Sequence, residues 1–203
     1  MNEALELFHK GGLVMYALLL ASVFTVTIAI ERYLYYKKAD SGEKFAEEIS
    51  QLFRAGDIAA AKELCAQSKG ENAAILSDVM DSNINNAEYI ERYLESEAGI
   101  SLAKLKNRIP YLGIVVTMAP LLGLLGTVVG MISSFNVFAA QSGEPHAITG
   151  GVGEALIATA SGLCVAIIAL ICHSYFTQKI DTMLTNMERT FSAYVESLYR
   201  RQG

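Results

Sequence analysis

The sequence lacks the features of a soluble enzyme or a nucleic-acid-binding protein. Its formal net charge is −5, so no excess of basic residues is available to bind phosphate backbones. Its three cysteines, Cys65, Cys164 and Cys172, form no CxxC motif and have no clustered histidines beside them, which leaves neither a zinc site nor a disulfide framework. There is no HExxH motif, and the apolar runs contain no pair of facing acids. We therefore expect reduced, structural cysteines, no cofactor and no intramembrane enzyme.

Long runs without charge dominate the chain, of which 52% is hydrophobic. They cover residues 13–30, 111–140 and 155–176. A helix rises 1.5 Å per residue, so each run is long enough to cross most or all of a hydrocarbon core of about 30 Å. A cleaved signal peptide is the alternative for the first run, but acids precede it and no small-residue cleavage pattern follows it. The sequence predicts an all-α membrane protein with three transmembrane helices.

The distribution of lysine and arginine predicts the topology. Lys10 precedes the first run, none lies between the second and third, and the other fifteen fall within 31–109 or after residue 176. Positively charged loops remain in the cytoplasm, so we expect the N-terminus outside and the C-terminus inside. Aromatic residues at the run ends suit the membrane interface: Tyr33, Tyr35, Tyr36, Tyr111, Phe138, Tyr175 and Phe176.

The predicted order of segments follows from these runs. It comprises an extracytoplasmic N-terminus (1–12), a first span (13–30), a cytoplasmic helical insert (31–109), a second span (111–140), an extracytoplasmic loop (141–153), a third span (154–176) and a cytoplasmic C-terminal helix (177–203).

The charged segments show helical periodicity. In the insert, Phe45, Ile49, Leu52 and Phe53 predict one helix, and Gly56-Asp57 predicts a stop followed by a new N-cap. A second helix covers DIAAAKELCAQS, and a longer one is expected over 72–107, with Pro110 breaking or kinking its junction with the second span. The C-terminal helix carries an apolar stripe: Ile180, Met183, Met187, Phe191, Tyr194 and Leu198.

Small residues line one face of each of the last two spans. In the second span they are Gly123, Thr127, Gly130 and Ser134, and in the third Ala155, Thr159, Gly162, Ala166 and Ala169. Such faces allow membrane helices to approach closely, so tight packing between the two spans is the simplest interpretation.

Glu154 is an acid at the edge of the third apolar run. One interpretation places it at the interface, where it complements the dipole of its helix. The other turns it toward a water- or partner-filled interior, where it could load a proton while Thr127 and Thr159 relay or coordinate it. Three spans enclose no pore, so the second interpretation requires oligomerisation or a partner helix.

Two segments, APLLGLLGTVVGMISSF (119–135) and GEALIATASGLCVAIIAL (153–170), closely resemble the signature segments of the MotA/TolQ/ExbB proton-channel family. The layout of nearly the whole chain is also similar. Stator subunits of the MotA type usually have four spans, so three spans favour the ExbB or TolQ branch, with ExbB-like as the first choice.

The resemblance implies a ring of five subunits around the single membrane helices of two ExbD-like or TolR-like partner chains. Such a complex would use the proton-motive force to work on a TonB-like or TolA-like energy transducer in the bacterial inner membrane. The family's polar positions fall on Thr127, Glu154 and Thr159, and the proton-carrying aspartate belongs to the partner. Sodium coupling stays an alternative, as does a non-conducting scaffold.

The sequence departs from the family pattern at two places. Ile168 stands where many relatives have proline, which implies a straighter third span, and His173-Ser174 replaces the usual Tyr-Asn pair.

Overall fold

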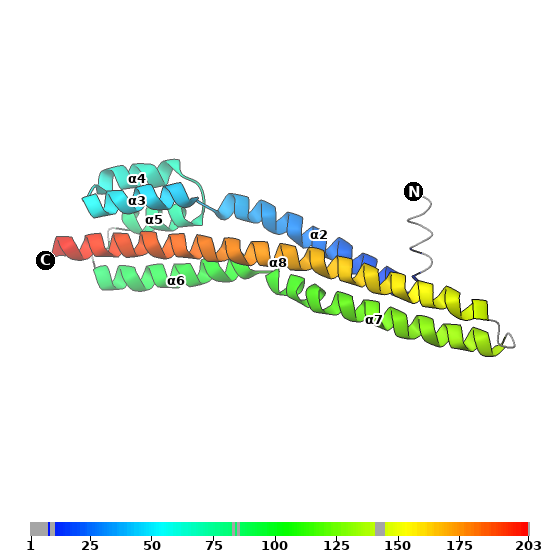
Figure 1. Ribbon diagram of the computed structural model, residues 1–203. Helices are drawn as coiled ribbons and strands as arrows, with labels where there is room; N and C mark the ends of the chain where they lie inside the picture. The colour runs from blue at the N-terminus through cyan, green and yellow to red at the C-terminus, as the bar shows by residue number, and fades with distance from the viewer. Residues whose placement is uncertain (1–7, 9–10, 83, 85, 141–144, 203) are drawn as a thin grey trace. The chain divides into compact units, whose positions relative to one another are not determined.

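The computed structural model describes residues 8, 11–82, 84, 86–140 and 145–202, and all regular structure in these residues is helical. The helices, in chain order, are α2 (Val14–Ala39), α3 (Glu43–Ala55), α4 (Ile58–Gln67), α5 (Glu71–Asp81), α6 (Ala87–Lys106), α7 (Ile109–Ala140) and α8 (Pro145–Gln202) (Figure 1). The predicted all-α class is confirmed.

The chain divides into two compact units. The apolar unit holds the described residues up to Ile30 and the segment Arg108–Tyr175. The amphipathic unit holds Glu31–Asn107 and the described residues from Phe176 onward. Helices α2 and α8 contribute to both units because each continues past the end of its apolar run.

Three helical stretches are long and apolar enough to cross a membrane. They lie within Val14–Ala55, Ala87–Ala139 and Gly150–Arg201. Large apolar side chains on these helices are exposed, including Leu20, Leu121 and Ile171, each more than 60% exposed. Exposing so much apolar surface to water is unfavourable, so these side chains are expected to contact lipid or other membrane helices.

The apolar unit packs α2 against α7 and the first part of α8. Its buried cluster contains Leu18 of α2, Val115 and Ala119 of α7, and Ala166 and Ala169 of α8. Four of these five side chains are small or β-branched, so the helix axes can lie close together.

The amphipathic unit is a helical bundle around an apolar core. The core takes Phe45, Ile49 and Phe53 from α3, Leu76 and Val79 from α5, Ile90 and Leu94 from α6, and Met187, Phe191 and Tyr194 from α8. The predicted stripe of the C-terminal segment is confirmed, since five of its six members are buried and Leu198 packs against the core.

The predicted helix stop and restart in the insert is also confirmed. Gly56 has φ 79°, and its N–H group bonds to the carbonyls of Leu52 and Phe53 at the end of α3. The Asp57 carboxylate then accepts a hydrogen bond from the Ala60 N–H at 3.0 Å and caps the start of α4.

Two predictions about helix continuity are wrong. The expected single helix over 72–107 is two helices, because α5 ends at Asp81 and Asn86 caps a new start by accepting from the Tyr89 N–H. The expected separate C-terminal helix is the continuation of the third apolar helix within α8. No glycine or proline occurs between residues 163 and 202, so nothing in the sequence interrupts α8 there.

Two of the aromatic residues expected at the membrane interface are core residues instead. Tyr36 and Phe176 are each 3% exposed, and their ring centroids lie 5.5 Å apart in an edge-to-face arrangement. The three cysteines are free thiols, and Cys65 is buried.

Candidate functional site

Glycines bring α7 and α8 into close contact. A Cβ atom added to Gly123 would lie 3.0 Å from the Cα atom of Thr159, and one added to Gly162 would lie 2.6 Å from the Ala119 carbonyl oxygen. Both obstacles are backbone atoms, which cannot rotate away. The two helices can therefore adopt this separation only if these positions carry no side chain.

The contact continues toward the end of α7. A Cβ atom on Gly130 would lie 3.1 Å from the Cβ atom of Ala155, and the Ser134 side chain occupies the space beside Gly151. Ser134 is 3% exposed, and its hydroxyl donates to the Gly130 carbonyl at 2.7 Å. We call this contact between α7 and α8 the glycine seam. Gly123, Gly130 and Gly162 lie within it, together with Ser134 and Ala155, and Ala166 continues it on α8 into the cluster with α2.

Two threonine hydroxyls border the glycine seam. The Thr159 Oγ1 atom donates to the Gly123 carbonyl at 3.0 Å and ties α8 to α7. The Thr127 Oγ1 atom donates to the Leu124 carbonyl of its own helix at 2.6 Å. Each hydroxyl hydrogen is thus used within the protein, while the oxygen lone pairs can still accept a hydrogen bond or contact a cation.

Helix α2 covers the opposite side of the seam. On α7, Gly126 lies between α8 and α2, because a Cβ atom there would be 2.5 Å from the Ala158 Cβ atom and 3.7 Å from the Val14 side chain, whereas Thr127 lies about 100° further round the helix. On α8, Val165 packs against the α2 cluster, and Thr159 lies about 120° from it. Since α7 and α8 are antiparallel, both rotations lead to the same side of the pair, and both threonines are partly exposed there.

Glu154 lies elsewhere on α8. Five residues separate it from Thr159, which turns the helix by about 140°, and its side chain is exposed. Val165 lies eleven residues after Glu154 and on the same face of α8, because eleven residues make about three helical turns. Glu154 therefore points to the side of α8 that packs against α2 at Val165. Within one chain the structure brings the two threonines to one side and does not bring Glu154 to them.

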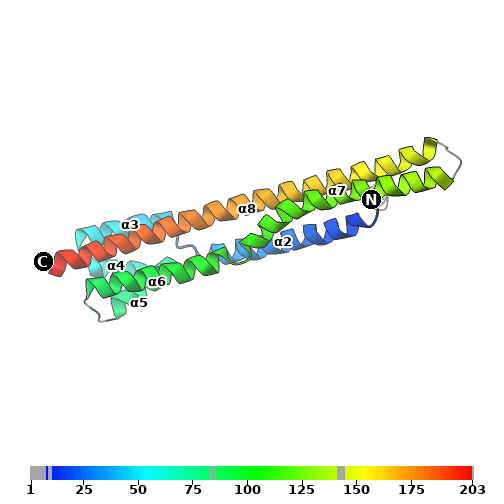
Figure 2. The same cartoon turned by 90° about the horizontal axis from the view of Figure 1, so that it is seen from below.

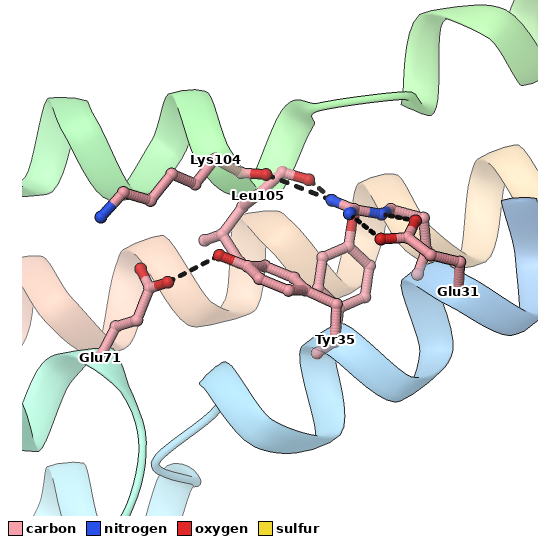
Figure 3. A network of polar contacts seen from close by, with 7 residues as sticks. Glu31, Tyr35, Glu71, Lys104 and Leu105 are labelled. Atoms are coloured by element: carbon pink, nitrogen blue, oxygen red, sulfur yellow. Dashed lines mark hydrogen bonds and ion pairs between the residues drawn. The ribbon is translucent and has the colours of Figure 1, made fainter.

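A second polar cluster lies in the amphipathic unit, where α2 meets the end of α6 (Figure 3). The Arg32 side chain is 5% exposed, forms an ion pair with Glu31 and donates to the Lys104 carbonyl at 3.2 Å. The Tyr36 hydroxyl donates to the Leu105 carbonyl at 2.7 Å. The last carbonyls of a helix lack partners within it, so Arg32 and Tyr36 cap the C-terminus of α6.

The same cluster extends to α5 through Tyr35. The Tyr35 hydroxyl donates to Glu71 Oε1 at 2.8 Å, and the Tyr35 ring lies 4.6 Å from the Arg32 guanidinium carbon. Burial, followed by the bond to Glu71, raises the pKa of Tyr35 to about 12. The second oxygen of Glu71 is buried without a hydrogen-bond partner among the described residues.

The junction before α7 follows directly on the capped end of α6. Arg108 has φ 68°, a left-handed conformation that an arginine rarely adopts, and α7 begins at Ile109. Pro110 falls in the first turn of α7, where its missing N–H costs no helical hydrogen bond. The predicted break near Pro110 is confirmed: α6 ends at Lys106 and α7 begins at Ile109, one residue before the proline.

Sequence reasoning missed the cluster around Arg32. The sequence pattern predicts Tyr35 and Tyr36 only as interfacial rings and assigns no role to Glu31 or Arg32. An arginine followed three and four residues later by two tyrosines was the available signal, because these residues share a helix face. His173, one of the residues that depart from the family pattern, lies against α7, with its Nε2 atom 3.5 Å from where a Cβ atom of Gly113 would be.

These features define a polytopic helical membrane protein whose second and third apolar helices meet along a glycine seam. The profile of the MotA/TolQ/ExbB proton channel family matches residues 67–189. A putative biopolymer transport protein, ExbB-like 1 of Synechocystis sp., is 33% identical over 176 residues, which cover 82% of this chain and 68% of the relative.

Two further relatives carry names from both branches. The biopolymer transport protein ExbB of Salmonella typhimurium is 30% identical over 179 residues, covering 83% of this chain and 73% of the relative. The Tol-Pal system protein TolQ of Pseudomonas aeruginosa is 30% identical over 168 residues, covering 82% and 67%. The chain belongs to the MotA/TolQ/ExbB proton channel family. It is therefore a multi-pass inner-membrane protein of a channel family and not an enzyme.

Proposed function

We propose that this chain is the ring-forming subunit of an inner-membrane proton channel that couples the proton-motive force to mechanical work on an energy-transducing partner. One observation carries the proposal. Thr127 and Thr159 border the glycine seam on the side that α2 leaves open. A ring of copies with α2 outward would direct both threonines toward a common lumen.

The number of spans supports a ring, because three helices leave no room for a pore among themselves. We propose five copies, with the N-terminus outside and the C-terminus in the cytoplasm. The lumen would hold two single-span partners of the ExbD or TolR kind, each with a membrane carboxylate. Those partners would in turn act on a TonB-like or TolA-like transducer.

The chemistry of the seam suits a proton carrier. Since both hydroxyl hydrogens are bonded to carbonyls, Thr127 and Thr159 would offer only oxygen lone pairs to the lumen. Lone pairs accept a hydrogen bond from a protonated carboxyl group or a water chain, and they repel a bare carboxylate. They also suit sodium, which is the alternative coupling ion. Each elementary charge that crosses releases about 2.3 kcal/mol per 100 mV.

We assign Glu154 to the extracytoplasmic mouth of the pathway, where its exposed carboxylate would attract cations. In this role it need not share a face with the two threonines. Its charge would raise the local proton concentration, and the threonines would act further along the lumen.

Within the family we favour the ExbB-like role, energising uptake across an outer membrane. The relatives whose names contain ExbB support this role. The TolQ relative supports the alternative role in envelope maintenance. A non-conducting scaffold is the second candidate, and the observation in its favour is that the seam's hydroxyls already serve to pack the chain.

A substitution on α7 tests the proposal in cells that depend on the gradient-driven process. Thr127→Val keeps the shape of the side chain and removes the oxygen, so gradient-dependent work should be lost while membrane insertion and oligomerisation persist. Thr27→Val is the matched control, because Thr27 is an exposed threonine of α2, which the proposed ring turns outward, and its hydroxyl donates to the Val23 carbonyl of its own helix at 2.8 Å. Full activity of Thr127→Val would favour the scaffold.

A further inference from the structure

The amphipathic unit contains a groove between α6 and the last part of α8, which lie side by side in both views (Figures 1 and 2). Its volume is about 450 Å³, within the range of ligand-sized clefts. Leu94, Phe191 and Val195 contribute to its lining. These side chains belong to the core and are at most 9% exposed, so the floor of the groove is apolar and firmly packed.

The charges on the groove are all of one sign. Glu91 and Glu95 lie one turn apart on α6, and Glu188 faces the groove from α8. Among the described residues, Glu95 and Glu188 form no ion pair, and Glu91 accepts only a 3.3 Å hydrogen bond from the Tyr199 hydroxyl. This contrasts with nearby acids outside the groove, such as Glu88, which pairs with Arg92.

An apolar floor with acidic edges is complementary to one kind of partner. A helix with apolar side chains on one face and lysine or arginine beside them would pack its apolar side chains against the partly exposed Leu102 and Leu184 of the lining and place its basic groups at the carboxylates. A two-fold pairing of this groove with the same groove of a second copy is disfavoured, because it would set acid against acid. The amphipathic unit as a whole carries 17 acidic and 14 basic residues, a net charge of −3.

We propose that the groove between α6 and α8 binds a basic amphipathic segment that flanks a transmembrane helix of a partner chain. Membrane proteins concentrate lysine and arginine next to their spans on the cytoplasmic side, so such segments are available there. That the segment flanks a transmembrane helix rests on the topology given under the proposed function. That it is basic and amphipathic rests on the charges and apolar floor of the groove alone.

The test uses the full-length chain in nanodiscs of uncharged lipid. The probe is a labelled peptide of about 18 residues with leucines at helical spacing and lysines elsewhere. A peptide with glutamate in place of lysine and one with the same composition in scrambled order are its controls. Fluorescence anisotropy measures binding, and a photoreactive group on the peptide identifies the contact.

Two variants separate charge from shape. The triple variant Glu91→Gln, Glu95→Gln, Glu188→Gln removes the charges, and Gly99→Phe fills the groove. Gly99 lines the groove and a Cβ atom there meets nothing within 4 Å, so a side chain can begin at this position without a backbone clash, and circular dichroism checks that the variant is folded. We expect each variant to weaken binding about tenfold or more. A control triple, Glu43→Gln, Glu63→Gln, Asp78→Asn, removes the same charge outside the groove.

Crosslinks confined to α6 and α8, together with unchanged binding in the control triple, would support the proposal. Equal binding by all variants, or by the scrambled peptide, would overturn it. So would a change in oligomeric state in Gly99→Phe, since that result would identify a second copy as the occupant. Proton flux is a separate readout, so a failure of peptide binding would leave the proposed channel function standing.

Discussion

The Thr159 hydroxyl on α8 donates a 3.0 Å hydrogen bond to the Gly123 carbonyl on α7, at the point where a Cβ atom on Gly123 would be 3.0 Å from Thr159 itself. The same residue therefore ties the two helices together and borders the side that α2 leaves open. A structural role and the proposed role in the proton pathway therefore fall on one side chain. Substitutions that separate its oxygen from its shape are needed to distinguish them.

The seam should not tolerate a methyl group at Gly162. A Cβ atom there would lie 2.6 Å from the Ala119 carbonyl oxygen, and the backbone of α7 would have to move. We expect Gly162→Ala to lower the free energy of unfolding in detergent by about 1–3 kcal/mol, the usual cost of overpacking. Denaturant titration followed by circular dichroism measures this change.

Gly99→Ala is the matched control for that experiment. Gly99 is also a helical glycine, but a Cβ atom there meets nothing within 4 Å. The substitution should stabilise the protein by about 0.5–1 kcal/mol, because alanine favours the helix. If Gly162→Ala proved as harmless as Gly99→Ala, α7 and α8 would not be in contact at the seam.

The cap on α6 should depend on the Tyr36 hydroxyl. Tyr36→Phe removes the 2.7 Å bond to the Leu105 carbonyl and leaves a buried acceptor without its donor. We expect a loss of about 1–3 kcal/mol and faster amide hydrogen exchange in the last turn of α6. Tyr33→Phe is the control, because Tyr33 is 55% exposed on the same helix and should change neither quantity. Unchanged exchange in Tyr36→Phe would show that α6 ends without this cap.

Alkaline pH should destabilise the amphipathic unit. Burial raises the pKa of the Cys65 thiol from 9.0 to about 12 and that of the Tyr36 hydroxyl from 10.0 to about 12. Both groups bind their protons more tightly when folded, so their stabilisation is complete below pH 9 and is lost as the pH rises toward 12. The free energy of unfolding should therefore fall over this window. Cys65→Ala should flatten the part of the slope that begins near pH 9, and equal slopes for both proteins would contradict this assignment.

The sequence predicted those parts of the fold that depend on local pattern. Eighteen or more uncharged residues marked each apolar helix, and Gly56-Asp57 marked a helix end because a left-handed glycine and a capping aspartate act within one turn. The small faces of α7 and α8 followed from residue spacing alone. Family membership followed from two long signature segments that the family profile also covers.

Other features depend on contacts between distant residues and could not be read from spacing. Tyr36 was expected at the membrane interface because position alone cannot show that Phe176 packs against it. The rotation of Glu154 relative to Thr159 was available from their separation of five residues, but the side of the seam that α2 covers required the structure. The helix end at Asp81 also needed it, since the surrounding residues tolerate either a break or a continuous helix.

The central claim is that the Thr159 oxygen lies on the proton pathway, and proton flux measures this most directly. The chain is reconstituted with the proposed single-span partner in vesicles that contain a pH-sensitive dye, and an imposed potential drives the flux. Thr159→Ser keeps the hydroxyl and should retain the proton flux. Thr159→Val keeps the shape of the side chain and should lower the proton flux at least about tenfold. Native mass spectrometry checks that the oligomer is intact in both variants. Flux through the Thr159→Val assembly equal to that of the unmodified protein would contradict the account.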